Sequence, residues 1–444
     1  MDPSVDRRWR RGIAAAALLP LLAACGDTAR LPPGASQGPK PNLPAPTRTL
    51  IPTVHVAPAK GWPEGRTPRP AAGLSVTAFA TGLEHPRWVH VLPNGDVLVA
   101  ESNAPTRPED GKGVKAFFVR QVMKRAGASA PSANRITLLR DADGDGHAEL
   151  RTPFIEGLAS PFGMALVGDA LYVANTDGIL RFPYRTGATH ISVNGTPVVD
   201  LPGGPINHHW TKNIIASRDG KRLYATVGSN SNVAENGIDK EEGRAAIWEV
   251  DLERRSKRLF ASGLRNPNGM AIEPRTGALW TVVNERDELG SDLVPDYLTS
   301  VQDGAFYGWP YSYFGGHVDN RVKPERPDLV AKAKVPDFAL GTHVAPLGLA
   351  WSSGSKLPEP FIDGMFVGEH GSWNRRPPNG YKVVFVPFAK NGRPEGGPPL
   401  DVLTGFLSPD GEAWGRPVGT AIDTRGGLLV ADDVGNTLWR VSAQ

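Results

Sequence analysis

Two adjacent histidines, His208 and His209, lie in the stretch INHHW at 206–210. An imidazole titrates close to neutral pH, so it can take a proton from a substrate hydroxyl as a general base. Loop histidines also bond backbone carbonyls without any chemical role. The pair therefore predicts a catalytic base only if other reactive groups converge on it, and the sequence leaves open which histidine that is.

Three loop arginines form the second candidate group. Arg265 lies beside Asn266 in GLRNPNG, Arg416 lies in GRPVG, and Arg375 lies in EHGSWNRRP. A single loop arginine is usually solvated, and Asn-Pro and Asn-Gly pairs form turns. Arg265 and Arg416 occupy comparable places in recurring segments, and Arg375 follows a strand of another. Together they predict a cationic set that binds a multiply charged carboxylate ligand.

An acidic stretch could bind a metal ion. Asp141, Asp143 and Asp145 alternate before Gly146, and this spacing can bend three carboxylates toward one Ca²⁺ ion. The twelfth position of a calcium-binding EF-hand loop is Glu, whereas this chain has Thr152 there; Glu149 is a possible substitute. The alternative is an acidic hairpin turn without a metal, and the sequence does not decide between the two.

These residues belong to segments that recur after residue 75. Each segment has a polar loop, a short apolar strand, a Gly, Asp or Asn turn, a second apolar strand and a polar tail. The six segments are Gly82–Ser102, Gly157–Thr176, Asn207–Asn232, Gly263–Gly290, His343–Trp373 and Gly415–Asp433. Such repetition predicts an all-β, six-bladed β-propeller over residues 75–444, with the polar loops around one central opening.

Two insertions interrupt the rhythm. Residues 103–134 carry basic residues and apolar residues at helical spacing, which predicts a short amphipathic helix that packs on its own domain or lies on a membrane surface. Residues 292–326 contain DGAFYGWPYSYFGG, an aromatic and glycine-rich stretch that predicts either a substrate lip or a packed loop.

The N-terminus predicts export. A basic leader and a short apolar run end at Leu22-Ala-Ala-Cys25, which resembles a bacterial lipobox. We expect a signal peptide over 1–24 and a lipid on Cys25, the sole cysteine. The protein would then lie on the periplasmic face of a membrane, with the outer membrane weakly favoured. Residues 25–74 are rich in proline and predict a disordered, extended tether. The net charge of +3 indicates no nucleic-acid partner.

The order of six motifs resembles the soluble glucose/sorbosone dehydrogenase family, and most closely its sorbosone dehydrogenase branch. The motifs are PFGMA, INHHW, GLRNPNGMA, NERDELG, YGWPY and EHGSWNR. The resemblance covers about Leu83 to Val441 and implies a six-bladed propeller that binds pyrroloquinoline quinone (PQQ) and Ca²⁺. It further implies oxidation of an aldose or sorbosone-type sugar by hydride transfer, with a membrane quinone or cytochrome as a possible electron acceptor.

The resemblance also assigns roles to residues. His208 matches the family's base, and His209 is its neighbour at the cofactor and the alternative base. Arg265 matches the arginine at the reactive quinone oxygen, Asn266 a cofactor-contacting amide, and Arg416 an arginine that binds a cofactor carboxylate.

The resemblance is less close at other positions. Asn207 replaces the acidic residue that precedes the family's base, and Arg375 is offset from the family's cofactor-binding lysine. The family's two calcium-binding carbonyls match Arg286 and Asp287, where the carboxylates of Glu285 and Asp287 are possible further ligands.

Two other functions are compatible with a propeller. A calcium-dependent lactonase or similar hydrolase would need inner-channel ligands, for which the candidates are Asn175, Asn230, Glu285 and Glu369. A non-catalytic glycan-binding propeller would use the aromatic side chains of Trp309, Tyr311 and Tyr313. The hydrolase gives no special reason for the set of arginines.

Overall fold

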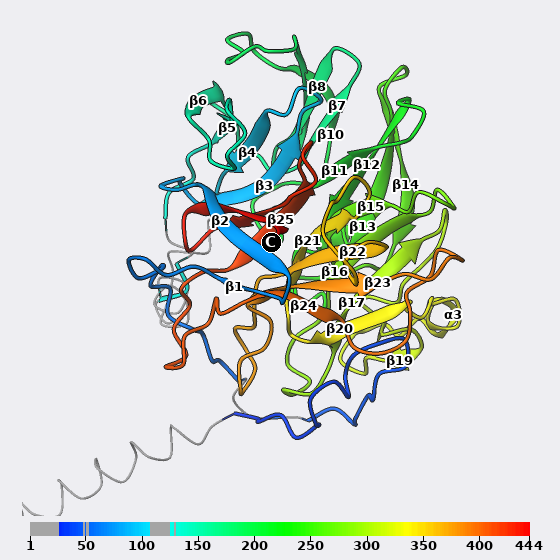
Figure 1. The fold of residues 1–444 in the computed structure, drawn as a ribbon. Coiled ribbons are helices and arrows are strands. Elements are labelled where there is room, and N and C mark those ends of the chain that lie inside the picture. Colours follow the sequence, from blue (N-terminus) through cyan, green and yellow to red (C-terminus); the bar gives the residue numbers. More distant parts are fainter. Residues whose placement is uncertain (1–25, 48, 50–52, 107–124, 128–129) are drawn as a thin grey trace, which may run out of the picture.

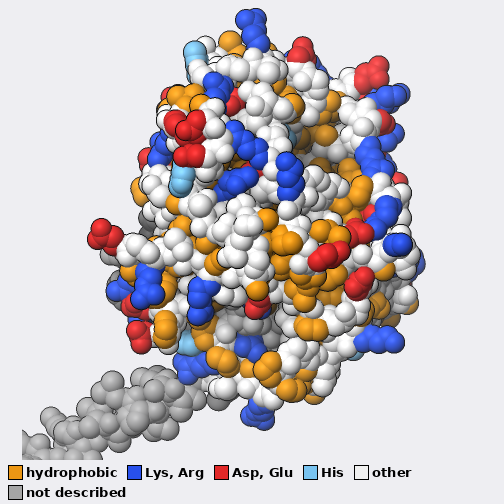
Figure 2. Space-filling model, in the orientation of Figure 1, with side chains coloured by type: hydrophobic (Ala, Val, Ile, Leu, Met, Phe, Trp, Pro, Cys, Tyr) orange, Lys and Arg blue, Asp and Glu red, His pale blue; other side chains and the backbone are white. Residues whose placement is uncertain are grey.

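The computed structural model describes residues 26–47, 49, 53–106, 125–127 and 130–444. Their regular secondary structure is nearly all strand, and six antiparallel sheets of four or five strands surround a central axis (Figure 1). The prediction of an all-β, six-bladed propeller is confirmed. Basic and acidic side chains are interspersed over the face drawn in Figure 2.

The chain builds the six blades in sequence order. Blade 1 contains β3 (Pro86–Val91), β4 (Val97–Glu101), β5 (Arg135–Arg140) and β6 (Leu150–Ile155). Blade 2 contains β7 (Met164–Val167), β8 (Ala170–Ala174), β9 (Gly178–Pro183) and β10 (Thr196–Asp200). Blade 3 contains β11 (Ile214–Ala216), β12 (Arg222–Val227), β13 (Ala246–Asp251) and β14 (Ser256–Ser262).

The remaining blades carry additions. Blade 4 contains β15 (Asn266–Ile272), β16 (Leu279–Asn284), β17 (Pro295–Val301) and β20 (Phe338–Thr342). Blade 5 contains β21 (Pro346–Trp351), β22 (Gly364–Glu369), β23 (Lys382–Pro387), β24 (Leu400–Thr404) and the short β1 (Arg69–Pro70). Blade 6 contains β25 (Pro417–Ile422), β26 (Leu428–Asp432), β27 (Thr437–Ala443) and β2 (Leu74–Ala80). A hairpin of β18 (Ser312–Tyr313) and β19 (His317–Val318) and two single-turn helices, η2 (Ile238–Glu241) and α3 (Pro327–Val330), lie in loops.

The innermost strands close a ring, because β3, β7, β11, β15, β21 and β25 each contact the next and β25 contacts β3. Three of them, β15, β21 and β25, carry glycine two residues after a proline, the same pattern immediately precedes β7, and each glycine faces a neighbouring strand. A Cβ on Gly269 would lie 2.6 Å from the Leu349 nitrogen. A Cβ on Gly348 would clash with the Val418 carbonyl oxygen. The repeated Pro-x-Gly pattern therefore reflects close backbone approach around the axis.

The core lies between the blades, so the second strand of a blade is covered on both faces. Strands β4, β8 and β26 are buried along their whole length. This explains why they are continuously apolar rather than alternating. The N-terminal β2 pairs with β27 and completes blade 6, so that the two ends of the domain close the ring together.

The segment before β2 differs from the predicted disordered tether. Its described residues are extended but packed against the propeller: Gly38 bridges to Ala339 in β20, and the dark-blue trace passes beside β20 and β19 (Figure 1). Trp62 packs against Phe406, Trp414 and Trp439, with ring centroids 5.4–6.0 Å apart. Backbone hydrogen bonds and the Trp62 side chain hold this segment against the propeller. The proline-rich composition of the segment did not predict these contacts.

Some predictions fall outside the described residues. The signal peptide and Cys25 do, and so does most of the predicted helix within 103–134. No helix of the described part of the chain is both long and apolar enough to cross a membrane.

Candidate active site

The candidate residues gather at one end of the blades, where each innermost strand begins and the second strand ends. The pairs Pro86–Glu101, Asn266–Asn284 and Pro417–Asp432 mark this edge in three blades. We call it the site end. The polar loops and tails of the sequence repeats therefore lie side by side here, as the repeats predicted.

His209 is held with a defined tautomer. Its Nδ1 lies 2.8 Å from the carbonyl oxygen of Ser229, which can only accept, so Nδ1 carries the proton and Nε2 is left as the acceptor. Burial, with Arg265 nearby, lowers the pKa of His209 well below its usual value. The imidazole is therefore neutral at neutral pH with Nε2 unprotonated, and the lowered pKa makes it a weaker base than a free histidine.

His208 is half-buried and precedes His209 in the same loop. The structure brings His209, the alternative base, against Ser229 and Gly228 and beside Arg265. A Cβ on Gly228 would clash with both His209 Cβ and Asn266 Oδ1. Glycine at this position therefore lets both side chains pack against the backbone of residue 228.

The Asn207 side chain contacts two buried basic side chains and has no hydrogen bond to His209 among the described residues. Its Oδ1 accepts hydrogen bonds from Lys212 Nζ at 3.3 Å and from the Arg244 guanidinium at 2.7 Å. Both cations are buried; burial lowers the pKa of Arg244 to about 10 and that of Lys212 well below its usual value. They hold Asn207 at a φ of 35°, just before the two histidines.

Arg265 is buried and fully oriented. Its guanidinium donates to the Glu285 carbonyl at 2.7 Å and to Asn232 Oδ1 at 3.1 Å, and it pairs with Asp287 at 3.1 Å. Asp287 also accepts from Asn374 Nδ2 at 2.7 Å and lies 3.6 Å from His343 Nδ1. Burial opposes ionisation of Asp287, but Arg265 and His343 outweigh it and hold the pKa of the carboxyl below its usual range.

Asn232 connects these groups, and sequence reasoning missed it. Its Oδ1 accepts from Arg265 and from the Asp287 amide at 2.8 Å, while its Nδ2 donates to the Asp287 carbonyl at 3.2 Å. Its own carbonyl accepts from Trp309 Nε1 at 2.9 Å. Trp309, in the YGWPY stretch, is thus packed behind the site. The one available signal was the tail position of Asn232 in the third repeat.

Arg416 forms a second cationic centre at the same end. Its guanidinium lies 5.2 Å from the Tyr381 ring centroid and donates to the Ala57 carbonyl at 3.3 Å. Beside it, Asp433 pairs with His370 at 2.9 Å and with Arg87. Burial lowers the pKa of His370 to about 4. Arg87, His370 and Asp433 were also missed, because their partners lie in other blades.

Several buried polar atoms at this end lack a partner among the described residues. They are Asn266 Oδ1, Asn374 Oδ1, Arg87 Nε and Arg416 Nε. A native structure leaves few such atoms unpaired. This mixture of orphan donors and acceptors, contributed by four blades, suits a ligand that carries carboxylates and further hydrogen-bonding groups.

Arg375 is held by neighbouring loops of the protein. Its Nε donates to the Ser291 carbonyl and to Thr342 Oγ1, each at 3.0 Å, and its Nη1 donates to the Pro377 carbonyl at 2.6 Å. The Nε and Nη1 groups of Arg375 thus have protein acceptors, and its supply of charge to a ligand stays a prediction. These contacts use the guanidinium to hold the loops of blades 4 and 5 together.

The predicted calcium-binding carbonyl of Asp287 is already engaged. It accepts from the Arg286 guanidinium at 2.6 Å and from Asn232, while Arg286 also pairs with the buried Asp319. Glu285 is different, since its Oε1 has no partner among the described residues. Burial raises the pKa of Glu285 to about 7. Of the predicted metal ligands at the site end, Glu285 has an available side-chain oxygen.

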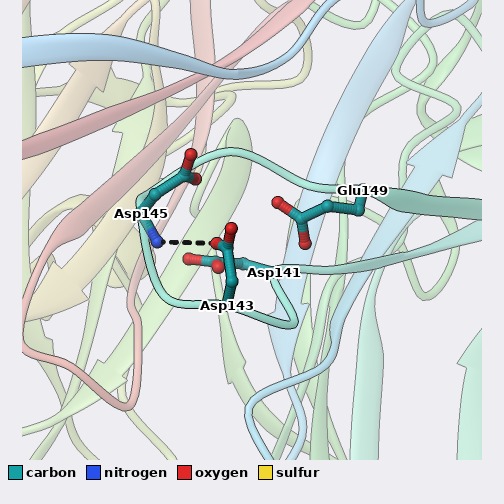
Figure 3. A group of neighbouring side chains, drawn as sticks. All are labelled: Asp141, Asp143, Asp145 and Glu149. Carbon is teal, nitrogen blue, oxygen red and sulfur yellow. Dashed lines mark hydrogen bonds between the residues drawn. The ribbon is translucent and has the colours of Figure 1, made fainter.

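The acidic loop lies at the opposite end. Because β5 starts beside the end of β4, the loop that follows β5 is remote from the site end. Figure 3 shows Asp141, Asp143, Asp145 and Glu149 gathered there, with ligand oxygens within 4.8 Å of one another. Asp141 pairs with Arg425, and the loop's own amides donate to the carboxylates. The loop is separate from the active-site chemistry.

The described residues thus form a six-bladed propeller with buried arginines and histidines clustered at one end. The sequence profile described as TrAA12-like matches residues 68–299 and 326–444. The chain belongs to this family.

Individual relatives agree with that assignment. The chain is 30% identical over 242 residues to an uncharacterised protein of Borreliella burgdorferi, covering 54% of this chain and 62% of that protein. It is 27% identical over 223 residues to the PQQ-dependent pyranose dehydrogenase of Coprinopsis cinerea, covering 40% of this chain and 30% of that protein. It thus spans less than two thirds of each of these relatives.

A solved structure of a carbohydrate-active enzyme of family AA12 from Trichoderma reesei superposes with a TM-score of 0.68 at 20% identity. The match covers 90% of this chain and all of that one. At this identity the likeness establishes the fold.

Proposed function

We propose that the protein is a PQQ-dependent sugar dehydrogenase. The observation that carries the proposal is the neutral His209 beside Arg265, in a site end where orphan polar atoms converge. The name of the Coprinopsis relative supports the same cofactor and substrate class. An aldose or a sorbosone-type sugar aldehyde is the proposed substrate.

The side chains of the site support this chemistry. His209 Nε2 accepts the proton of the sugar hydroxyl, and the Ser229 carbonyl fixes the ring for that task. Arg265 lies where it can stabilise developing negative charge. Arg416 and Arg87 offer unpaired Nε–H donors to carboxylates. The chemistry that PQQ supplies when bound is two-electron acceptance, as hydride, at a quinone carbonyl.

The assignment of the base changes from His208 to His209. The contacts with Ser229, Gly228 and Arg265 favour His209, because a general base needs a fixed ring and a deprotonated acceptor nitrogen.

Ca²⁺ as a Lewis acid is part of the proposal. Glu285, with its unpartnered Oε1, is the proposed protein ligand. The Asp287 carbonyl is not proposed, since Arg286 and Asn232 already occupy it.

The test uses purified protein with PQQ and Ca²⁺ added separately and together. Reduction of an artificial dye with aldoses or sorbosone, dependent on PQQ, is the expected result. Hydrolysis of lactones without PQQ would instead establish the hydrolase. Failure to bind PQQ by absorbance titration would remove the dehydrogenase proposal. Chelation and re-addition of Ca²⁺ tests the metal, with Glu285→Gln as the variant that raises the Ca²⁺ concentration required.

A further inference from the structure

The first described residues are docked tightly rather than loosely attached. The Asp27 carboxylate accepts from the Ser291 amide at 2.7 Å, and the Asp27 carbonyl accepts from Ser291 Oγ at 2.9 Å. Three residues later, the Arg30 amide donates to Asp292 Oδ2 at 2.5 Å. Asp27 is buried. The chain therefore has a fixed exit point at this place.

This exit point lies at the site end. Ser291 belongs to the loop that leaves β16 and carries Glu285, Arg286 and Asp287. Cys25 is two residues before Asp27, and two residues span at most about 7 Å. A lipid on Cys25 would consequently emerge beside the loop that positions Arg265, not at the end of a long tether.

The surface around the exit is suited to a bilayer surface. Trp373 and Val54 are each 44% exposed, and the His55 amide donates to the Trp373 carbonyl at 2.8 Å, so the two lie on neighbouring segments. Trp373 is the one aromatic residue among the exposed large hydrophobic side chains of the described chain. Tryptophan is favoured at the boundary between lipid headgroups and hydrocarbon.

We propose that the lipidated protein stands on the membrane by its site end, with the mouth of the site turned toward the bilayer surface. The proposal rests on the lipid at Cys25 predicted from the sequence. It goes beyond the proposed dehydrogenase activity and does not depend on it. The partner is the lipid bilayer itself.

The test places a fluorophore at each end of the propeller. Because the sequence has one cysteine, which the lipid would block, an introduced cysteine is the single reactive thiol. Lys60→Cys labels the site end, and Asp169→Cys labels the turn between β7 and β8 at the opposite end; their side chains are 58% and 90% exposed. The full-length lipidated protein is reconstituted in phosphatidylethanolamine and phosphatidylglycerol vesicles that contain headgroup spin-labelled lipid.

We expect several-fold stronger quenching of the probe at residue 60 than at residue 169. Equal or reversed quenching would overturn the proposal, as would mass spectrometry showing that Cys25 carries no lipid. Asp27→Ala removes the carboxylate contact with the Ser291 amide and should reduce the difference between the two probes, while vesicle binding and dye reduction persist. Thr28→Ala, an exposed neighbour, is the matched control and should preserve the difference. A difference unchanged by Asp27→Ala would exclude docking as its cause.

Discussion

Asn232 shows how one neutral amide can set the electrostatics of a site. It contacts Arg265 and Asp287 through both side-chain heteroatoms, so the ion pair is oriented by a group without charge. A residue with this role acts through Arg265 and is a positioning residue. Its importance is therefore visible in the pH and substrate dependence of the reaction rather than in folding.

We expect Asn232→Asp to lower turnover by at least about tenfold, or about 1.4 kcal/mol in the barrier. The new carboxylate would neutralise Arg265, repel Asp287 and remove the donor to the Asp287 carbonyl. The measurement is kcat and its pH profile in PQQ-loaded protein. Asn236→Asp, four residues away, is the control. An unchanged pH profile with lost cooperative unfolding would indicate a structural role instead.

Alanine substitutions of His209 and His208 should differ in their effect on turnover. We expect His209→Ala to reduce turnover by about 10²–10⁴-fold, the range typical of a lost general base. PQQ affinity should change little, because the cofactor's proposed charged contacts come from arginines. His208→Ala should have a smaller effect. The reverse order in steady-state assays would return the base assignment to His208.

At the scale of elements, the end of β22 holds an unusual acid. Glu369 is fully buried, and neither carboxylate oxygen has a partner among the described residues. Burial raises its pKa to about 8. Above about pH 4.5 the unfolded chain releases this proton while the folded protein keeps it, so folding stability falls as the pH rises from about 4.5 to 8.

We therefore expect Glu369→Gln to stabilise the protein more at pH 8.5 than at pH 5. The gain at high pH is on the order of a few kcal/mol, because unfolding of the variant no longer releases a proton from this side chain. Urea unfolding at the two pH values measures it. Glu412→Gln, at a more exposed carboxylate, is the control and should show no such pH dependence.

The innermost strands make a second prediction at this scale. Gly348→Ala would place a methyl group against the Val418 carbonyl between β21 and β25. We expect a loss of about 1–3 kcal/mol or more in the free energy of unfolding, as for other overpacked sites. Gly396→Ala is the control, since a Cβ there meets nothing within 4 Å. Equal urea midpoints for the two variants would contradict the close approach of the strands.

At the scale of the whole molecule, the N-terminal segment spans blades 4, 5 and 6. Trp62 anchors it and donates to Asp432 Oδ2 at 2.7 Å. Trp62 is partly buried, so we expect Trp62→Ala to cost at most about 3–5 kcal/mol in the free energy of unfolding, the range for fully buried large aromatics. Trp373→Ala, at an exposed tryptophan, should change it by much less when the unlipidated form is unfolded in solution.

The sequence predicted the propeller and the end of the blades that carries the site, because each repeat encodes its own loop and strand pair. It could not reveal Asn232, Arg87 or Asp433, whose roles depend on contacts between blades. It also predicted that the N-terminal segment is a free tether. Proline content indicates the stiffness of a segment but not whether the segment packs against the rest of the protein. The choice of His209 over His208 likewise required the position of Ser229.

The pairing of β2 with β27 has a consequence for biosynthesis. Strand β2, near residue 80, must wait for β27 in the last ten residues before the sheet of blade 6 is complete. A nascent chain emerging from the ribosome can form individual blades, but it cannot complete the sheet of blade 6 until its last residues have been made. Such a delay is compatible with passage through a translocation channel before the fold becomes complete.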